Sequence, residues 1–429
     1  MNSEFGKAIT GKEIINGLLN VLVVAITPPL PQITGGAKAI AQTIIPLSNE
    51  FNYHLLLIGD GSTLNIVNNN INTYKKHFCT ITVTKRQLVP KYTFGKLFYY
   101  FERNSNKLPF LQINFYSKQT IQTTRNIINK YKIDLFDLQT THVAFIKKFF
   151  SQIPAVLVSQ NIETDLFWMN EHYNDPRKTF NIAIEKYFAK RSNRNAINAE
   201  LKNKFNIECM TFVTQNDSDR VEGCNNKYVL SLGYHFDKKI KKENHKTFNV
   251  IWLGGFDWYP NLQAMEWFVD NVYPILIKKY NCCINSINFQ IVGRNPSAKI
   301  LKLNSTNFQV LGFVENINSI ISQADLSIAP IVSGGGIKTK VVECMVNKIP
   351  VVSTKSGVIG TGLQHNKSCY ITNNPEKFAD LIIEAYKNKN KIIEMAEVAY
   401  KIAQDHFDLN KFIDLKRSIY KKLSNCREI

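Results

Sequence analysis

Long hydrophobic runs are absent from the sequence. No run approaches the roughly 20 apolar residues that a helix needs to cross a bilayer. The run from Leu18 to Ile26 is too short to span one, so we expect it to form a buried strand. Residues 1–17 lack the long apolar centre of a secretory signal. These absences favour a cytoplasmic protein and leave a peripheral position at the inner face of the membrane open.

Cysteine-based sites are also missing. The eight cysteines are scattered, and only Cys282 and Cys283 are adjacent. The sequence has no Cys-x-x-Cys pair and no metal-binding spacing that includes histidine. We therefore expect reduced thiols and no metal site.

Acidic residues are scarce relative to basic ones. The chain has 53 Lys and Arg against 34 Asp and Glu, a net charge of +19. An anionic membrane surface, nucleic acid or a merely lysine-rich surface would each account for this excess. No RNA-binding motif with interleaved aromatics is visible, so we do not expect nucleic acid as a partner. Residues 92–114 and 175–204 are the candidate basic or interfacial segments, and a packed helix with one solvated face is the alternative for each.

The length and apolar content predict two domains. A chain of 429 residues, 44% of them hydrophobic, exceeds one ordinary domain and can bury a core in each of two. Short apolar runs alternate with helical patterns, which is typical of doubly wound sheets. The strands expected in the first half are 21–26, 53–59, 79–84, 133–139, 155–159, 209–214 and 228–232. Those in the second half are 250–254, 288–292, 308–311, 326–329 and 349–353, with a long helix over 260–280.

The stretch Ala324–Thr354 has the pattern of a strand, a glycine loop, a helix and a second strand. Leu326–Ala329 is an apolar run closed by Pro330, and we expect Ser333 to cap the helix. Three glycines before a helix leave backbone N–H groups at the positive end of the helix dipole, where an anion binds. A plain glycine turn followed by solvated lysines is the alternative.

This stretch resembles the carboxyl-terminal domain of the family 4 retaining glycosyltransferases, which have the GT-B fold. One subgroup carries Gly-Gly-Gly-x-(Arg/Lys)-x-Lys-x-x-Glu-Ala-Met followed by Pro-Val-Val-Ser-Thr, here Gly334–Met345 and Pro350–Thr354. Other segments that resemble the subgroup are its opening strand and loop, Trp252–Asn261, and its middle loops, Val292–Pro296 and Leu311–Val314. Order and spacing match over about residues 248–365.

The resemblance implies an α/β protein of GT-B fold, with two doubly wound Rossmann-like domains facing a cleft. We expect an acceptor-binding domain over residues 1–235, a linker over 236–247 and a nucleotide-sugar-binding domain over 248–408. Residues 409–429 are expected to form a helix that packs back on the first domain.

The resemblance also implies a donor site. Glu343 would hydrogen-bond the ribose hydroxyls, and Lys340 would hold the diphosphate. Arg294 is a further phosphate candidate, because a guanidinium binds two oxygens at once. The other expected donor-binding residues are Gly334, Gly335, Gly336, Lys338, Gly312, Phe313 and Val314.

Acceptor contacts are expected from the first domain. Gly35 and Gly36 follow the first strand, and the resemblance places this loop near the transferred sugar; a plain turn is the alternative. Asn161 and Glu163 are the other candidates. Relatives commonly have a histidine where Gln160 stands, and a lone histidine such as His142 is usually structural.

Two departures from the family pattern concern the donor site. Many members have a glutamate seven residues before a second one, and here only Glu343 is present, with Gly335 at the first position. Many also carry an Arg and a Lys after the opening strand of the second domain, where this chain has Gly255–Trp258. Arg294, Lys338 and Lys340 are the expected substitutes.

The resulting hypothesis is a retaining glycosyltransferase that needs neither metal nor organic cofactor. It would move a sugar from a nucleotide diphosphate sugar, a UDP- or GDP-sugar, to a saccharide, lipid-linked or other acceptor, as in polysaccharide biosynthesis. A non-catalytic GT-B subunit that binds a nucleotide or a partner, a nucleotide-sugar epimerase and a nucleic-acid-binding protein are the alternatives.

Overall fold

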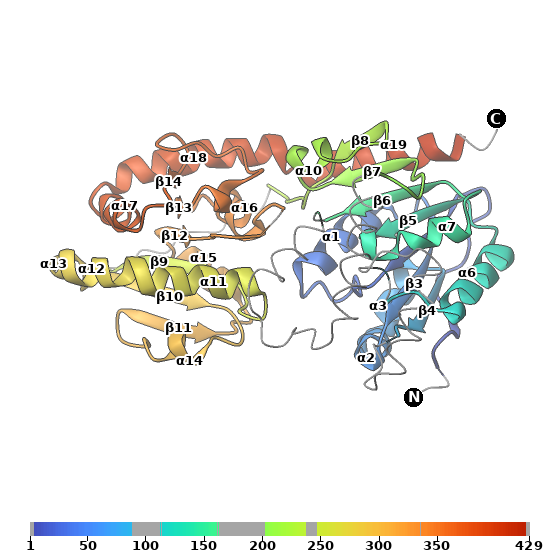
Figure 1. Cartoon of the computed structure of the whole chain (residues 1–429), viewed down its shortest axis with the longest axis horizontal. Helices are drawn as coiled ribbons and strands as arrows, with labels where there is room; N and C mark the ends of the chain where they lie inside the picture. The colour runs from blue at the N-terminus through green and yellow to red at the C-terminus, as the bar shows by residue number, and fades with distance from the viewer. Residues whose placement is uncertain are drawn as a thin grey trace, which may run out of the picture. The chain divides into compact units, whose positions relative to one another are not determined.

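The computed structural model describes residues 4–87, 112, 114–160, 162, 202–236, 247–334 and 336–425. It divides the chain into two compact units (Figure 1). The first unit comprises Met1–Gly233 and Leu409–Ile429, and the second comprises Tyr234–Asp408. Most of the expected linker and of the segments 92–114 and 175–204 lies outside the described residues.

The first unit is built on an eight-stranded sheet in the order β1-β4-β3-β2-β5-β6-β7-β8. All its neighbouring strands are parallel except β1, which pairs antiparallel with β4. The strands are β1 (Ala8–Thr10), β2 (Asn20–Ala25), β3 (Asn52–Gly59), β4 (Thr80–Lys85), β5 (Leu135–Gln139), β6 (Ala155–Ser159), β7 (Cys209–Phe212) and β8 (Asn226–Val229). Its described helices are α1 (Gly35–Ile44), α2 (Gly61–Asn69), α3 (Ile71–His77), α6 (Lys118–Tyr131), α7 (Phe145–Phe149), α10 (Gln215–Asp219) and α19 (Leu409–Asn425), with 3₁₀ turns η1 (Ile45–Leu47) and η2 (Thr141–Val143).

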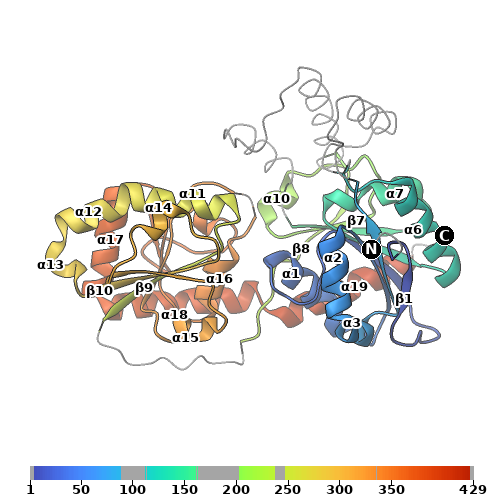
Figure 2. The same cartoon turned by 90° about the horizontal axis from the view of Figure 1, so that it is seen from below.

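The central strands are apolar on both faces because helices cover both faces of the sheet. Alternate residues of β2 enter different cores: Leu22 packs with Leu56 and Phe136, whereas Val23 packs with Leu55. The carboxyl-terminal helix α19 belongs to the second of these cores, where it lies beside α1 (Figure 2).

Helix α19 is joined to the sheet by a buried ion pair. The Lys416 Nζ atom lies 2.8 Å from Asp137 Oδ2 of β5, and both side chains are fully buried. The Tyr420 hydroxyl also donates to Asp137, and Gln139 Nε2 donates to Asp137 Oδ1 at 2.7 Å. Near the surface, Arg417 binds both carboxylate oxygens of Glu50, at 2.6 and 2.8 Å. The last helix is therefore an integral part of the first unit.

The second unit contains a six-stranded parallel sheet in the order β11-β10-β9-β12-β13-β14. Its strands are β9 (Phe248–Leu253), β10 (Ile287–Val292), β11 (Phe308–Gly312), β12 (Leu326–Ala329), β13 (Val351–Ser353) and β14 (Tyr370–Ile371). Its described helices are α11 (Tyr259–Trp267), η4 (Phe268–Val272), α12 (Tyr273–Lys279), α13 (Asn281–Ile284), α14 (Ala298–Leu301), α15 (Ile317–Ser322), α16 (Thr339–Val346), η5 (Ser356–Val358), α17 (Pro375–Lys387) and α18 (Lys389–His406).

The single helix expected over 260–280 has a π-helical turn, η4, between α11 and α12. Pro274 lies in the first turn of α12 and has no N–H to donate to the preceding turn, which accounts for the interruption. The α/β prediction is confirmed by the two sheets and their covering helices. Among the described residues, no helix is both long and apolar enough to cross a membrane.

Candidate anion site in the second unit

The glycine loop between β12 and α16 is longer than the sequence suggested. The expectation that Ser333 caps the helix is wrong, because α16 begins at Thr339 and Lys338 occupies the N-cap position. Gly334 and Gly336 have φ angles of +110° and +62°, which are incompatible with a helix start. The Ser333 hydroxyl instead donates to Gln263 Oε1 of α11, which fixes the start of the loop.

Lys338 stabilises the loop itself. Its ammonium donates to the carbonyl oxygens of Gly334 at 3.0 Å and Gly336 at 2.9 Å. Lys338 therefore organises the backbone of the loop, and its direct contact with a ligand stays a prediction.

Lys340 has a different environment. Its Nζ atom donates to Asn261 Oδ1 of α11 at 2.7 Å and lies 3.6 Å from the ring centroid of Trp252. Trp252 belongs to β9 and is fully buried. A cation over an indole ring gains about 2 kcal/mol or more when it is desolvated. Two side chains from the opening strand and the helix after it thus hold the ammonium in place.

The Lys340 ammonium is not neutralised within the described part of the chain. The structure gives it no ion pair with a carboxylate of those residues. Burial lowers the pKa of Lys340 well below its usual range; the Lys338 charge acts in the same direction, and the Cys344 thiol opposes both. A partly desolvated cation without a counter-ion is destabilising, so the arrangement favours an anion from outside the protein.

Glycines bring the backbone close to this site. A Cβ atom on Gly254 would lie 2.5 Å from Lys340 Nζ, and one on Gly255 would lie 3.4 Å from Arg294 Cγ. A Cβ on Gly293 would lie 2.0 Å from the Gly254 carbonyl oxygen, so the ends of β9 and β10 touch there. The structure therefore brings Lys340 and Arg294 to consecutive glycines at the carboxyl end of one parallel sheet, where ligands of such sheets bind.

Arg294 is paired on the protein. Its Nε atom lies 2.6 Å from Asp257 Oδ2, and Asn295 Nδ2 donates to Asp257 Oδ1 at 2.6 Å. The hydrogen bond from Asn295 and then the Arg294 guanidinium lower the pKa of the Asp257 carboxyl. Both members of the ion pair are about half exposed. Asp257 therefore orients Arg294 while the guanidinium keeps a solvent-facing side.

The remaining donor-site candidates lie on neighbouring elements. Gly312 ends β11 with a φ of +66°, and its carbonyl accepts from Gly293 N at 2.8 Å. Phe313 is 68% exposed, which leaves its ring available to a ligand. Glu343 lies one turn after Lys340 on α16. Burial raises the pKa of Tyr234, and the negative charge of Glu343 raises it further. The Tyr234 hydroxyl donates to the Thr339 carbonyl at 3.3 Å and so supports the first turn of α16.

Among the first-unit candidates, Gly35 and Gly36 are the first residues of α1. A Cβ on Gly36 would lie 3.3 Å from Gln160 Oε1, so the start of α1 and the residue after β6 are adjacent. Gln160 Nε2 is buried without a partner among the described residues. Asn161, Glu163 and the second-unit residue Gly335 lie outside the described residues.

His142 is a structural residue. Burial lowers its pKa to about 4, so the ring is neutral at pH 7. Its Nδ1 atom lies 3.2 Å from Thr140 Oγ1, and its ring packs edge-on against Phe115. The described residues include no group of three or more His, Cys, Asp or Glu side chains that could hold a metal ion.

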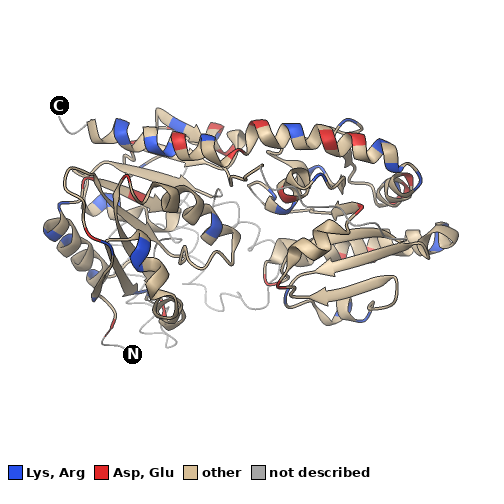
Figure 3. Cartoon of the chain, turned by 180° about the vertical axis from the view of Figure 1, so that it is seen from behind, with Lys and Arg blue, Asp and Glu red and all other residues tan. Residues whose placement is uncertain are grey.

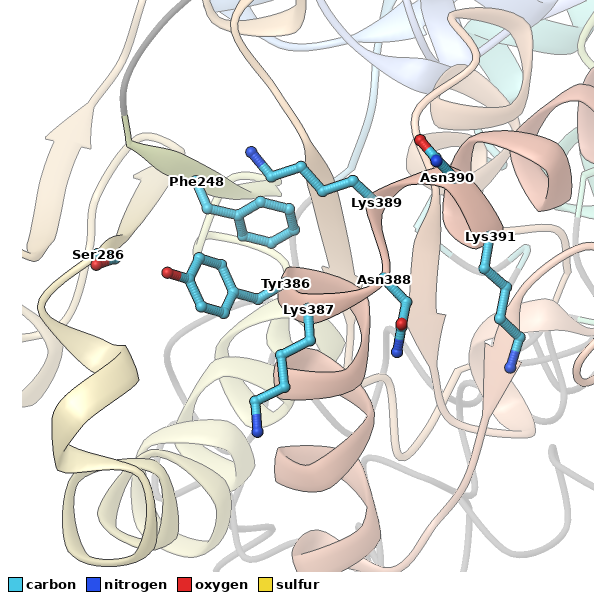
Figure 4. A pocket seen from close by; sticks show the side chains of 8 residues that line it. All are labelled: Phe248, Ser286, Tyr386, Lys387, Asn388, Lys389, Asn390 and Lys391. Atoms are coloured by element: carbon cyan, nitrogen blue, oxygen red, sulfur yellow. The ribbon is translucent and has the colours of Figure 1, made fainter.

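A pocket of about 800 Å³ lies at the start of β9, whereas Lys340 lies near the end of that strand. Figure 4 shows its side chains, with the ring of Phe248 beside that of Tyr386 and lysine side chains around them. Three exposed lysines line it: Lys387, Lys389 and Lys391. This pocket and the Lys340 site therefore lie at opposite ends of β9.

The comparisons with known proteins concern mainly the second unit. Residues 247–388 match the family model of the group 1 glycosyl transferases. An uncharacterized 44.6 kDa protein in the cps region of Klebsiella pneumoniae is 30% identical over 189 residues, or 43% of this chain and 48% of that protein. The aligned part thus spans about half the length of this curated relative.

Solved structures resemble the whole chain. Anabaena HepE in complex with UDP has a TM-score of 0.62 at 15% identity, covering 95% of this chain and 100% of that one. Sucrose-phosphate synthase from Thermosynechococcus elongatus has a TM-score of 0.65 at 10% identity, with 95% and 100% covered. These likenesses confirm the predicted GT-B fold. Residues 247–388 are thus similar to the group 1 glycosyl transferases, and the chain has the GT-B fold.

Proposed function

We propose that this protein transfers a sugar from a nucleotide diphosphate sugar to an acceptor hydroxyl. The observation that carries the proposal is the half-buried Lys340 ammonium, which has neutral ligands and lies at the carboxyl end of a parallel sheet. The group 1 match of residues 247–388 supports the same reaction class. HepE has been solved with UDP and with UDP-glucose, which supports a UDP-sugar as the donor.

In the proposed mechanism, Lys340 stabilises the negative charge that grows on the leaving diphosphate. Arg294, oriented by Asp257, supplies a second cation, and Glu343 accepts hydrogen bonds from the ribose. The acceptor hydroxyl attacks from the face that the diphosphate leaves, which retains the anomeric configuration. Fixed cations of the protein carry the charge stabilisation, so we expect transfer without an added metal ion.

The acceptor is proposed to be a saccharide or a lipid-linked saccharide. The Klebsiella relative comes from a cps region, which supports a role in polysaccharide assembly. Gly35 and Gly36 stay the candidates for acceptor contact in the first unit, because the first turn of α1 lies beside Gln160, the residue after β6.

Nucleotide binding is the first test. We expect one of UDP, GDP, ADP and dTDP to raise the unfolding temperature, because a ligand that binds only the folded state stabilises it. At about 100 times its dissociation constant the ligand adds about 2.7 kcal/mol. The shift should disappear in Glu343→Ala, and a short RNA should produce none. The measurement is thermal unfolding of the purified protein with each ligand in turn.

The outcomes separate the alternatives. A shift with no nucleoside diphosphate would contradict the donor site, and a shift with RNA alone would replace the enzyme by a nucleic-acid-binding protein. A non-catalytic GT-B subunit is the second candidate, favoured by Gln160 and Gly335 at positions where relatives have histidine and glutamate. It would bind a nucleotide without cleaving UDP-glucose, with or without a saccharide acceptor.

Contact with an anionic membrane surface is a further part of the proposal. Figure 3 shows side chains of both charge signs along α18 and α19. The end of α17 and the first turn of α18 carry the three lysines that line the 800 Å³ pocket, Lys387, Lys389 and Lys391. Lys391 is paired with Glu384 at 2.8 Å, whereas Lys389 lies over the Phe248 ring. Each lysine near anionic headgroups adds about 1 kcal/mol.

Vesicle binding tests this contact. We expect the protein to sediment with phosphatidylglycerol vesicles and not with phosphatidylcholine vesicles, and Ala at Lys387, Lys389 and Lys391 to weaken that binding about tenfold or more. The matched control places Ala at Lys75, Lys76 and Lys118, which are exposed lysines of the first unit. Equal losses in the two triple variants would assign the binding to overall charge and contradict a role for this pocket.

A further inference from the structure

The ligands of the Lys340 ammonium differ from those of the two buried lysines, Lys147 and Lys416. Lys147 and Lys416 are buried, and each has a carboxylate close by, Glu208 at 2.6 Å and Asp137 at 2.8 Å, whereas Lys340 is half-buried. Lys340 instead has the amide oxygen of Asn261 and the indole face of Trp252. The protein thus stabilises its lysine ammonium groups in two ways, with carboxylates or with neutral groups.

Neutral ligands and carboxylates have different consequences for a cation. A carboxylate stabilises the ammonium and cancels its charge, so little field is left for a third group. An amide oxygen and a π face attract the ammonium through partial charges and leave the full positive charge in place. A lysine held in this way is fixed in position and still able to bind an anion.

The Trp252 side chain is not optimal for packing alone. It is fully buried in β9, yet its indole N–H has no hydrogen-bond partner among the described residues. A buried donor without a partner is destabilising, and a phenylalanine would fill similar space without that donor. The feature that an indole adds is the strongest cation-binding face among the side chains.

Asn261 is held in a defined orientation. Its Nδ2 atom donates to the Gly255 carbonyl at 2.7 Å, so its Oδ1 atom is the one that faces Lys340. Gly254 leaves room beside the ammonium, since a Cβ there would lie 2.5 Å from Nζ and 3.0 Å from Asn261 Nδ2. The orientation of the amide and the space beside it both keep an oxygen, and not an N–H group, against the lysine.

We propose that Trp252 and Asn261 are positioning residues that hold the Lys340 side chain in place, without a carboxylate, for the diphosphate of the donor. This inference rests on the proposed function. Neither residue touches the reacting atoms; both act through Lys340. The family pattern of an Arg and a Lys after the opening strand is absent here, and in this chain β9 and α11 would supply ligands for a lysine from α16 instead.

The test converts one neutral ligand into a charged one. Asn261→Asp replaces an amide oxygen by a carboxylate of the same size beside Lys340, and so neutralises the ammonium. We expect it to weaken binding of the diphosphate that binds the wild type, UDP or GDP, by about 10- to 100-fold, the loss of one charge-assisted contact. Binding of the matching nucleoside, uridine or guanosine, should stay unchanged, because it has no phosphate.

Control variants separate position from charge. Asn271→Asp adds the same charge in the π-helical turn after α11, where the exposed amide donates to the Trp267 carbonyl, and should leave diphosphate binding as in the wild type. Trp252→Phe keeps a weaker π face and should lose less affinity than Trp252→Leu, which has none. The binding constants come from calorimetry for the diphosphates and ligand-observed NMR for the nucleosides.

The results distinguish this inference from the proposed function. If the wild type binds UDP or GDP and Asn261→Asp binds it equally well, the positioning role is wrong while the donor site stands. A loss of diphosphate and nucleoside binding together would indicate a merely structural role and would also overturn the inference. If the wild type binds neither UDP, GDP, ADP nor dTDP, the proposed function fails and the inference fails with it. Trp252→Leu removes a core side chain, so Asn261→Asp decides the matter if that variant does not fold.

Discussion

Replacing Lys340 with Ala is expected to lower sugar transfer by about 100- to 1,000-fold, the usual effect of removing one preorganised group that stabilises a developing anion. The reason is the position of the ammonium, which Asn261 and Trp252 hold at the end of the sheet without an ion pair to the described carboxylates. The measurement is turnover of the nucleotide sugar with a saturating acceptor, at several donor concentrations.

The same variant should stay folded. Lys340→Ala leaves no described carboxylate without its cation, and it removes a desolvated charge, so its unfolding temperature should lie close to that of the wild type. Lys299→Ala is the matched control, because it removes an exposed lysine of the same unit that pairs with Asp270. Unchanged turnover in folded Lys340→Ala would contradict the assignment of this residue to the diphosphate.

The largest effect on stability is expected at Lys416. Its ammonium and the Asp137 carboxylate are fully buried 2.8 Å apart. Lys416→Ala leaves that carboxylate buried without its cation, which costs about 3–5 kcal/mol. Denaturant unfolding should show the loss, and hydrogen exchange should show it concentrated in α19 and β5.

A double variant identifies the cause. Asp137→Asn combined with Lys416→Met removes both charges, keeps an acceptor oxygen at position 137, and should recover part of the lost stability, because no charge is then left buried without its partner. Lys422→Ala, on the same helix but exposed, should change the unfolding free energy by less than about 1 kcal/mol. A small effect of Lys416→Ala would mean that water or a rearranged Tyr420 compensates Asp137.

The buried strands could be predicted well from the sequence. Ala155–Ser159 and Leu326–Ala329 have the bounds that their apolar runs indicate, because a strand covered on both faces is apolar throughout and ends at the first polar or turn residue. Strand β1 (Ala8–Thr10) was missed. It is three residues long, and its pairing with Thr80–Thr82 of β4 has no local signal in the sequence.

The site was only partly predictable. Lys340, Lys338 and Glu343 could be named from the motif. The different roles of the two lysines could not: Lys338 binds loop carbonyls, and Lys340 binds Asn261 and Trp252. The Lys340–Asn261 contact joins residues 79 positions apart. Trp252 and Asn261 stand in the segment that resembles the subgroup, and that was the available signal. The start of α16 was misplaced because positive φ angles at glycines extend a loop without changing its composition.

The return of α19 to the first unit has a consequence for biosynthesis. Helix α19 (residues 409–425) completes the first unit, whose strands are all synthesised before the second unit. The second unit can therefore fold during translation, whereas the first must wait with the Asp137 side of its sheet uncovered until the last helix emerges. A nonsense mutation just before Leu409 would accordingly send a chain with a finished second unit to proteolysis because of a defect in the first.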